Sequence, residues 1–518
     1  MFKGAIFDFD GTLYDYELCN DYALNVLLIE LSNEFLISLD ELSTFYKRMN
    51  SDIKKSNNCS NKFNKIIYIK KICENYGIRL EYVQKYLSLY EDKFYEKMKL
   101  FEGVIEVFEF LKKSNIKIAI VTNGKFEQQY KKLCYLNIIK YVDVIQTSDE
   151  CGYEKPSNHI YFEVQNKLNI PFNQLIMVGD NYEHDIIPAN KLGMLPFYYN
   201  MNVYDCYENV QIYKTCTELL HYFQSYLSSV KDLIELSKYF GQSELNVQGP
   251  GGNISVKMDN KMFIKSSGCV MANITPYSDY CVVDNKNIEK LYGYGKPSME
   301  SRFHSFMKKY TVHIHFLLSN IFLCSNNCMN EVMKDFSYNY KIVDYILPGK
   351  LLSDEIGKIY STNVDIYLLK NHGIILTGDS KEEIYILYKY MFEFFNSKLK
   401  YQYSFDSFLI NERLGGLKVV RETLFDKSIF ENVKYCFPDM AIFLQKVKSI
   451  DTMNELNIET DCDLLIYKNK VYVICDTASK YYSICEIIEH YKELYQYDLK
   501  LIENIYTLQN MEEEKYRK

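Results

Sequence analysis

The sequence lacks three features that would assign it to common classes of protein. No apolar run reaches the roughly 18 residues that a membrane-spanning helix needs, so we expect no membrane partner. The formal net charge is −8 and no basic stripe stands out, which argues against a nucleic-acid partner. The 15 cysteines have no regular spacing, so the sequence predicts neither a disulfide framework nor a thiolate zinc site, and reduced thiols in a cytoplasmic protein fit best.

An export signal is not expected either, because Met1-Phe2-Lys3 leads directly into the first predicted strand. The chain has 518 residues, of which 47% are hydrophobic. A single core stops growing at roughly 250 to 300 residues, so we expect several domains.

What the sequence does contain is, first, a pair of aspartates after a short apolar run. Residues 4–7 predict a buried strand; Asp8 and Asp10 follow it, and Gly11 allows a tight turn beside them. Carboxylates at the carboxyl end of a strand can hold a cation and attack a phosphate. Taken alone, the pattern also fits an ordinary junction between a strand and a turn.

Further polar residues follow in a compatible order. Residues 117–121 and 175–178 predict two more strands, each ending in polar side chains, and a lysine between them can offer a fixed positive charge to a phosphoryl group. These polar residues are Thr122, Asn123, Lys155, Asp180 and Asp185. Parallel strands end at one edge of a sheet, so we expect a shared crevice.

These motifs resemble those of the haloacid dehalogenase-like (HAD) hydrolases over residues 1 to about 225: Asp-x-Asp-Gly-Thr, a Thr or Ser, a Lys, and Gly-Asp-x-x-x-x-Asp. The resemblance implies that Asp8 is a nucleophile that forms an aspartyl-phosphate and that Asp10 is the general acid and then the base. Thr122, Asn123 and Lys155 would hold the phosphoryl group.

The resemblance also implies a Mg²⁺ site. Its ligands would be Asp8, Asp180 and the backbone carbonyl of Asp10, with Asp185 in support. Aspartate at position 10, rather than alanine or threonine, favours a phosphatase over a dehalogenase.

Residues 16–98, between the first two motifs, have helical periodicity without strand-like alternation. In the family such an insertion is a cap that closes over small phosphorylated metabolites and excludes water. We therefore expect a helical cap here.

A second domain is expected to begin at about residue 228. Residues 217–227 and 230–240 predict two helices, separated at Ser228-Ser229. Two segments with loops then present backbone N–H groups and small hydroxyls, at residues 248–256 and 262–268. Such loops can cradle a phosphate or a carboxylate, although loops of this kind between strands are usually turns.

Histidine is scarce, with eight in the chain, yet two histidines stand two positions apart in a predicted strand. This spacing puts the side chains of His313 and His315 on one face, and His372 follows another apolar run. Three imidazoles that leave a coordination position open are how catalytic zinc is held. Glu300, which precedes them, could be a base or a fourth ligand. A half-buried polar face would explain His313 and His315 equally well.

Residues 229 to about 400 resemble the class II aldolase/adducin family, with Gly-Gly-Asn-x-Ser, x-Ser-Gly, Lys-Pro-Ser-x-Glu, His-x-His and Asn-His-Gly in that family's order. The resemblance implies that His313, His315 and His372 bind Zn²⁺ and that Glu300 is the acid and base. Zinc would act as a Lewis acid and stabilise the enediolate left by carbon–carbon cleavage.

The same resemblance implies that the substrate phosphate is held by Asn253, Ser267, Gly268 and Ser298. Met299 departs from the family, whose aldolases commonly have a second serine there, so one hydroxyl is missing. Dehydratases, epimerases and decarboxylases share the zinc site, and adducin keeps the fold without it. Retention of the three histidines and Glu300 favours an enzyme.

Residues 405–518 carry no motif. Residues 440–444, 463–467 and 471–475 predict strands and residues 481–497 predict an amphipathic helix, so a small α/β extension is expected.

The sequence thus predicts an α/β protein: a Rossmann-like HAD domain at residues 1–227 with a helical cap at about 16–98, an α/β class II aldolase-like domain at 228–404, and an α/β extension at 405–518. The predicted protein is a bifunctional enzyme of carbohydrate metabolism. It would combine a Mg²⁺-dependent phosphatase acting on a small phosphorylated sugar or related metabolite with a Zn²⁺-dependent aldolase.

Two alternatives stay open for the second domain. It could be a dehydratase or epimerase, as in methionine-salvage fusions that join such a domain to a phosphatase in the opposite order, or a non-catalytic adducin-like binding domain. Class II aldolases are usually tetramers, so a homo-oligomer is expected.

Overall fold

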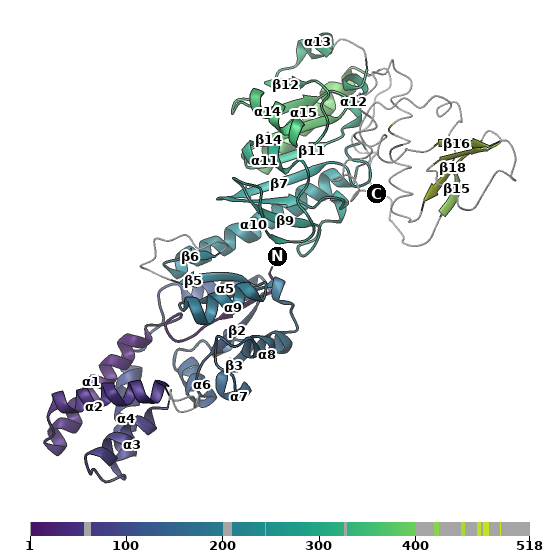
Figure 1. Ribbon diagram of the computed structural model, residues 1–518. Coiled ribbons are helices and arrows are strands. Elements are labelled where there is room, and N and C mark those ends of the chain that lie inside the picture. The colour runs from purple at the N-terminus through teal and green to yellow at the C-terminus, as the bar shows by residue number, and fades with distance from the viewer. Residues whose placement is uncertain are drawn as a thin grey trace. The chain divides into compact units, whose positions relative to one another are not determined.

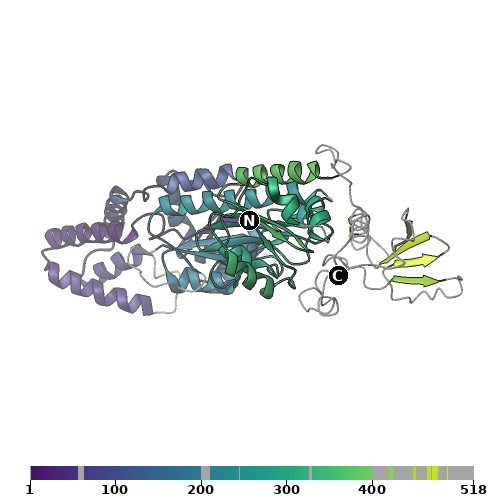
Figure 2. The same ribbon diagram turned by 90° about the horizontal axis from the view of Figure 1, so that it is seen from above.

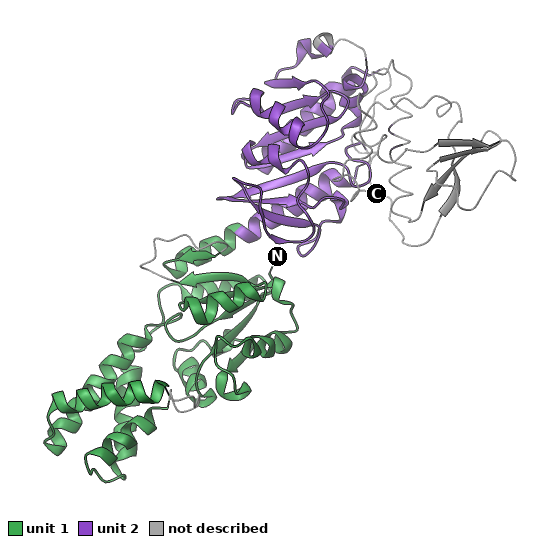
Figure 3. Ribbon diagram, viewed as in Figure 1, with its two compact units in different colours: residues 1–225 green, residues 226–518 purple. Residues whose placement is uncertain are grey.

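The computed structural model describes residues 2–55, 64–199, 210–243, 245–325 and 329–399, four strands between residues 419 and 475, and residues 487 and 490. The chain divides into two compact units, Met1–Ser225 and Tyr226–Lys518 (Figure 3).

Unit 1 is built on a six-stranded parallel sheet of order β3-β2-β1-β4-β5-β6. The strands are β1 (Gly4–Phe7), β2 (Lys117–Thr122), β3 (Val144–Thr147), β4 (Leu175–Gly179), β5 (Leu195–Tyr199) and β6 (Gln211–Tyr213). The order of the strands reverses between β1 and β4, so their carboxyl ends border the crevice where doubly wound sheets bind ligands. The strands predicted at residues 4–7, 117–121 and 175–178 are confirmed.

The predicted helical stretch contains four helices, drawn in purple at one end of unit 1 in Figures 1 and 2. They are α1 (Tyr16–Phe35), α2 (Leu39–Lys55), α3 (Lys65–Asn75) and α4 (Tyr82–Lys97). The remaining helical segments of unit 1 alternate with the strands. They are α5 (Val104–Lys113), α6 (Phe126–Tyr135), η2 (Ile139–Tyr141), α7 (Ser148–Cys151), α8 (Asn158–Leu168), η3 (Phe172–Gln174), η4 (Tyr182–Ile186) and α9 (Ile187–Lys191).

The core of unit 1 lies on the central strands, which are buried on both faces and rich in β-branched residues. Val121 and Met177, from β2 and β4, belong to one buried cluster with Ile160 and Val164 of α8. This packing fixes the strand ends that carry the polar motifs.

Unit 2 contains an eight-stranded sheet of order β10-β9-β8-β7-β11-β14-β13-β12, antiparallel except for the pair β12–β13. Its strands are β7 (Asn253–Met258), β8 (Lys261–Lys265), β9 (Tyr280–Asp284), β10 (Lys290–Gly293), β11 (Tyr310–Ile314), β12 (Tyr340–Val343), β13 (Ile366–Leu369) and β14 (Gly373–Gly378). Its helical segments are η5 (Met271–Asn273), α11 (Ser301–Phe306), α12 (Leu317–Leu323), α13 (Met329–Val332), η6 (Met333–Asp335), α14 (Lys350–Ile359) and α15 (Lys381–Ser397).

The helix break predicted at Ser228-Ser229 is wrong. Residues 217–240 belong to one helix, α10 (Cys216–Gly241), and the division between the two units falls inside it. The buried residues keep helical spacing through the two serines, at Leu219, Phe223, Tyr226, Val230 and Leu233. Serine in a helix costs only a few tenths of a kcal/mol, so Ser228 and Ser229 do not interrupt a continuous apolar stripe.

The described strands near the carboxyl end form a four-stranded sheet of order β15-β18-β17-β16. They are β15 (Val419–Thr423), β16 (Val447–Ile450), β17 (Leu464–Tyr467) and β18 (Lys470–Cys475). β17 and β18 correspond to the predicted strands 463–467 and 471–475. The strand predicted at 440–444 lies outside the described residues, as does the helix at 481–497 apart from residues 487 and 490.

Candidate active sites

The first site lies at the carboxyl edge of the parallel sheet in unit 1. Asp8 directly follows β1, and its backbone N–H donates to the Val178 carbonyl of β4 at 2.8 Å. Thr122 ends β2 and Asp180 follows β4. Adjacent parallel strands therefore bring together residues that are far apart in the sequence.

Three carboxylates form a cluster at this edge. Asp8, Asp180 and Asp185 each offer an oxygen, and these oxygens lie within 4.8 Å of one another. Thr12 Oγ1 donates to Asp180 Oδ1 at 2.8 Å. Gly11 has φ +93°, and a Cβ there would lie 2.5 Å from Asp180 Oδ2, so the turn requires glycine.

Lys155 is the cation of this cluster. It is buried, and its Nζ donates to Asp8 Oδ1 at 2.6 Å and to Asp185 Oδ1 at 2.7 Å. Burial alone would lower the pKa of Lys155, but the charges of Asp185 and Asp8 outweigh it and raise the pKa above its usual value. Asn123 accepts from the Lys155 backbone N–H at 2.8 Å and donates to its carbonyl at 3.3 Å, so in this structure its side chain positions the lysine.

One ammonium does not neutralise three carboxylates. Burial, followed by the charge of Asp8, raises the pKa of Asp180 to about 7. Burial raises the pKa of Asp185 to about 7 as well, although Lys155 opposes the shift. Oxygen-only ligands with excess negative charge suit a hard divalent cation, so the cluster fits Mg²⁺.

Asp10 has different partners and its side chain is not part of the carboxylate cluster. Its carboxylate accepts hydrogen bonds from Tyr14, from Gln129 at 2.9 Å and from Lys132 at 2.9 Å. Burial would raise its pKa, but Lys132 and the hydrogen bonds from Gln129 and Tyr14 outweigh burial, so the pKa is lowered. Gln129 also donates to Thr122 Oγ1 at 2.8 Å and thus links two predicted site residues.

The second site is in unit 2, where three imidazoles converge. His313 is in β11, His315 follows that strand, and His372 lies in the turn between β13 and β14. Their ring centroids are 4.8 to 5.2 Å apart, and one nitrogen of each lies within 4.8 Å of the others. Gly373 permits this approach, because a Cβ there would overlap the Ile314 carbonyl oxygen.

The histidine cluster fits a metal. His313 Nδ1 lies 3.0 Å from the Ile374 carbonyl oxygen, which can only accept, so in the neutral ring the proton is on Nδ1 and Nε2 carries the lone pair. A backbone carbonyl commonly orients metal-binding histidines in this way. All three rings are buried, and three nitrogen donors are a common zinc set.

Glu300 lies against these rings. Its Oε2 is 3.5 Å from His313 Nε2 and its Oε1 is 3.6 Å from His372 Nε2. Asn253 donates to Glu300 Oε2 at 2.7 Å, so here the asparagine orients the carboxylate. Behind it, buried His304 contacts Asn253 Oδ1 through Nε2 and Ser255 Oγ through Nδ1.

The remaining predicted residues of this half line a small cavity of about 30 Å³ next to Glu300, His315 and His372. They are Asn253, Ser267, Gly268 and Ser298. The cavity also includes Met299 and Lys265, whose buried Nζ donates to the carbonyls of Pro250 and Ser266 at 3.2 Å each. Lys265 therefore brings a positive charge to the cavity that Met299 also lines, and Met299 stands at the position where the resemblance predicted a second serine.

Comparison with known proteins gives a match in each half. Residues 5–197 match the haloacid dehalogenase-like hydrolases, and residues 231–396 match the class II aldolase and adducin N-terminal domain. Ribulose-1,5-bisphosphate 5-phosphatase of Halopiger xanaduensis is 30% identical over 203 residues, or 38% of this chain and 83% of that protein. Glyceraldehyde 3-phosphate phosphatase of Methanopyrus kandleri is 28% identical over 199 residues, or 38% of this chain and 82% of that protein. L-fuculose phosphate aldolase of Methanocaldococcus jannaschii is 30% identical over 152 residues, or 27% of this chain and 79% of that protein.

The chain joins a HAD hydrolase to a class II aldolase. It is therefore an enzyme of these two families, and both predicted resemblances and the α/β fold class are confirmed. No helix in the described part of the chain is long and apolar enough to cross a membrane.

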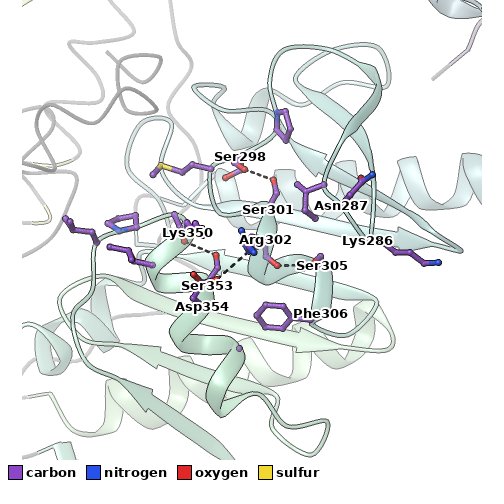
Figure 4. Close-up of a pocket in the computed structure, with 18 residues that line it drawn as sticks. Lys286, Asn287, Ser298, Ser301, Arg302, Ser305, Phe306, Lys350, Ser353 and Asp354 are labelled. Atoms are coloured by element: carbon purple, nitrogen blue, oxygen red, sulfur yellow. Dashed lines mark hydrogen bonds and ion pairs between the residues drawn. The ribbon is translucent and has the colours of Figure 1, made fainter. Parts of the chain in front are cut away.

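The aldolase domain has a larger cavity of about 890 Å³ beside its small one (Figure 4). Ser298, Met299 and Pro348 line both cavities. None of the three histidines lines the larger cavity, which is bordered instead by Arg302 and other polar side chains (Figure 4). The larger cavity therefore adjoins the small cavity without including the histidine cluster.

The sequence analysis did not identify several residues of the two sites. Lys132 and Gln129 share one face of α6 at a spacing of three, but many exposed lysines have such neighbours. His304 follows Glu300 by four positions, a helical spacing that could have been noticed. Lys265 is visible only through the tertiary structure.

Proposed function

We propose that the protein is a bifunctional enzyme: a Mg²⁺-dependent phosphatase that forms an aspartyl-phosphate, and a Zn²⁺-dependent class II aldolase acting on a sugar or sugar phosphate. The observation that carries the proposal is that each half brings together three side chains that could hold a metal ion, carboxylates in the first and imidazoles in the second. The named relatives support it, since they are phosphatases of phosphorylated sugars in one half and a sugar-phosphate aldolase in the other.

In the hydrolase domain, Asp8 attacks phosphorus and the bond to the leaving alcohol breaks. Lys155 donates to Asp8 Oδ1 at 2.6 Å and lines the same cavity as Thr122, so both could bind oxygens of the phosphoryl group. A magnesium ion bound by Asp8, Asp180 and the Asp10 carbonyl, with Asp185 in support, would neutralise charge on the phosphoryl group.

Asp10 moves the protons in this scheme. It gives a proton to the leaving oxygen and later takes one from the water that hydrolyses the aspartyl-phosphate. Its lowered pKa suits the second step, in which it must be a carboxylate. For the first step, Asp10 must gain a proton, so its contacts with Gln129 and Lys132 must loosen when the substrate binds.

In the aldolase domain, Glu300 transfers protons to and from the substrate carbon or oxygen. Asn253 fixes the carboxylate, and Lys265, Ser267 and Ser298 are suited to bind an anionic end of the substrate. A zinc ion held by the three histidines would act as a Lewis acid on the substrate carbonyl.

The substrates that fit both halves are small phosphorylated carbohydrates, because each half has a cation or small hydroxyls next to its reactive carboxylate. Self-association is part of the proposal, since class II aldolases build sites at subunit borders. The cytoplasmic location stays a prediction.

One experiment tests both activities with matched variants. Asp8→Asn should reduce release of phosphate from small phosphate esters by at least about 1,000-fold, because a neutral amide cannot act as the nucleophile. His313→Ala with His315→Ala should remove about one zinc ion per chain, measured by elemental analysis, and abolish aldehyde formation. Each variant serves as the control for the other site. Normal phosphate release by Asp8→Asn, or a folded wild type without zinc, would contradict the corresponding half of the proposal.

A further inference from the structure

The hydrolase site opens into a cavity of about 810 Å³ that continues under the helices α1, α2 and α3. Asp8 and Lys155 line one side of this cavity. Ligand pockets in proteins span about 300 to 1,000 Å³, so this cavity is large enough for a substrate that extends well beyond its scissile phosphate.

The helical wall of this cavity is basic. Ser43, Lys47, Asn50 and Lys54 line it at the spacing that places them on one face of α2, and Lys65 begins α3. The acid that these helices contribute to the cavity is Asp21. Three lysines therefore face one carboxylate on this side.

Lys65 is the most constrained of the three lysines. Its Nζ donates to Asn20 Oδ1 at 2.7 Å and lies 3.5 Å from the Tyr46 hydroxyl. It also lies 5.3 Å from the ring centroids of Tyr68 and Tyr90. In the described ranges, no carboxylate oxygen lies within 4.0 Å of this nitrogen.

This environment compensates the positive charge of Lys65 only in part. Burial, and then the charges of Lys132 and Lys54, lower its pKa to about 8, and Asp21 compensates only in part. Neutral oxygens and ring faces hold the ammonium in place but do not neutralise it. An anion in the adjoining cavity would supply the missing charge.

We propose that Lys65, with Lys47 and Lys54, forms a second anion site, which binds a negatively charged group at the far end of the phosphatase substrate. The substrate class is then a small phosphorylated metabolite with a second phosphate or a carboxylate, rather than one with a neutral end. The inference rests on the proposed function, because it assigns the far end of the substrate whose near phosphate is bound by Lys155.

The test measures how strongly added phosphorylated compounds inhibit the hydrolysis of p-nitrophenyl phosphate by the full chain. Competitors come in pairs that differ at the far end: glycerol 3-phosphate against 3-phosphoglycerate, and fructose 6-phosphate against fructose 1,6-bisphosphate. A hydrogen bond between charged groups corresponds to a factor of about 10 to 100 in affinity, so at least one anionic member should inhibit at a concentration lower by about that factor. The two pairs separate carboxylate from phosphate.

Lys65→Met keeps the length and apolar contacts of the side chain and removes the charge. This variant should reduce the ratio between the inhibitory concentrations of the two competitors in a pair to about 3 or less. Inhibition by the competitor with the neutral end should stay unchanged. Lys70→Met is the matched control, because Lys70 is on the same helix, is exposed and pairs with Glu74 at 2.6 Å. Thermal unfolding of both variants checks that they are folded.

The outcomes separate this proposal from the phosphatase assignment. The second anion site is refuted if the wild type does not prefer an anionic competitor in either pair. It is also refuted if Lys65→Met keeps the preference, or if this variant weakens inhibition by both competitors of a pair equally. Normal turnover by Asp8→Asn refutes the phosphatase assignment instead. Calorimetric binding of the same pairs to Asp8→Asn gives the comparison without turnover.

Discussion

The carboxylate cluster of the hydrolase domain should make its stability depend on pH in the absence of metal. Asp180 and Asp185 each have a pKa raised to about 7 from 3.8 by burial, with the charge of Asp8 adding to the effect. Lys155 stays protonated and balances only one of the three carboxylates. The folded, metal-free protein therefore takes up a proton that the unfolded chain releases at about pH 4.

The sign and size of this effect follow from linkage. Above about pH 4 the folded state holds more protons than the unfolded state, so its stability falls as the pH rises and levels off above about pH 7. Asp180 and Asp185 interact, so we count one proton for the pair. At about 1.36 kcal/mol for each pKa unit, the loss between about pH 5 and about pH 8 is roughly 3 kcal/mol.

The assay is calorimetric unfolding of the full chain in a chelator over this pH range. For a unit of this size, about 3 kcal/mol corresponds to a fall of roughly 6 to 12 °C in the Tm of the hydrolase transition. Magnesium at about 100 times its Kd should restore about 2.7 kcal/mol at the alkaline end. The metal binds the ionised cluster, so its effect at about pH 5 should be smaller.

Two variants assign the effect to the cluster. Asp180→Asn removes one carboxylate and keeps an oxygen that can accept from Thr12, so it should flatten the pH dependence and abolish the stabilisation by magnesium. Asp92→Asn, at an exposed carboxylate in the same unit, should change neither. A hydrolase Tm that stays level or rises between about pH 5 and about pH 8 in chelator would refute the reasoning.

Two further predictions concern single contacts. Lys132→Met removes a charge that lowers the pKa of Asp10, so the pH optimum of phosphate release should move to higher pH whether Asp10 acts as acid or as base. Lys131→Met, at the exposed neighbour, should leave the optimum in place. An unchanged pH profile for Lys132→Met would contradict the assignment of Asp10. Gly373→Ala places a Cβ against the backbone, so it should lower the stability of the aldolase domain by about 1 to 3 kcal/mol and reduce bound zinc. Gly357→Ala, whose Cβ would lie 3.8 Å from Phe306, should be neutral or stabilising. Equal Tm values for the two variants would contradict the packing argument.

Local patterns were enough to predict the strand ends of the hydrolase domain. Asp8, Thr122 and Asp180 each follow a short apolar run, and parallel strands must end at a common edge, so their convergence could be predicted without the structure. The same holds for His313 and His315, because a period of two fixes the face of a strand. Here the chain geometry determines where the side chains point.

Contacts between distant segments could not be predicted in this way. The predicted phosphate-binding roles of Asn123 and Asn253 did not include the hydrogen bonds that their side chains make with Lys155 and Glu300. Lys65 lies in a helical stretch rich in lysine, and nothing in its sequence neighbourhood separates it from Lys70. What distinguishes it is its contact with Tyr46 of α2 and Tyr90 of α4, which is a property of the packed cap.

The two clusters differ in the kind of metal ion that their ligand atoms suit. The hydrolase cluster offers only carboxylate oxygens, whereas the aldolase cluster offers imidazole nitrogens, so the first suits a hard ion and the second suits zinc. Each cluster also takes all its members from a single unit. Neither cluster therefore takes a candidate metal ligand from the other unit. Loss of one metal should consequently leave the other activity intact.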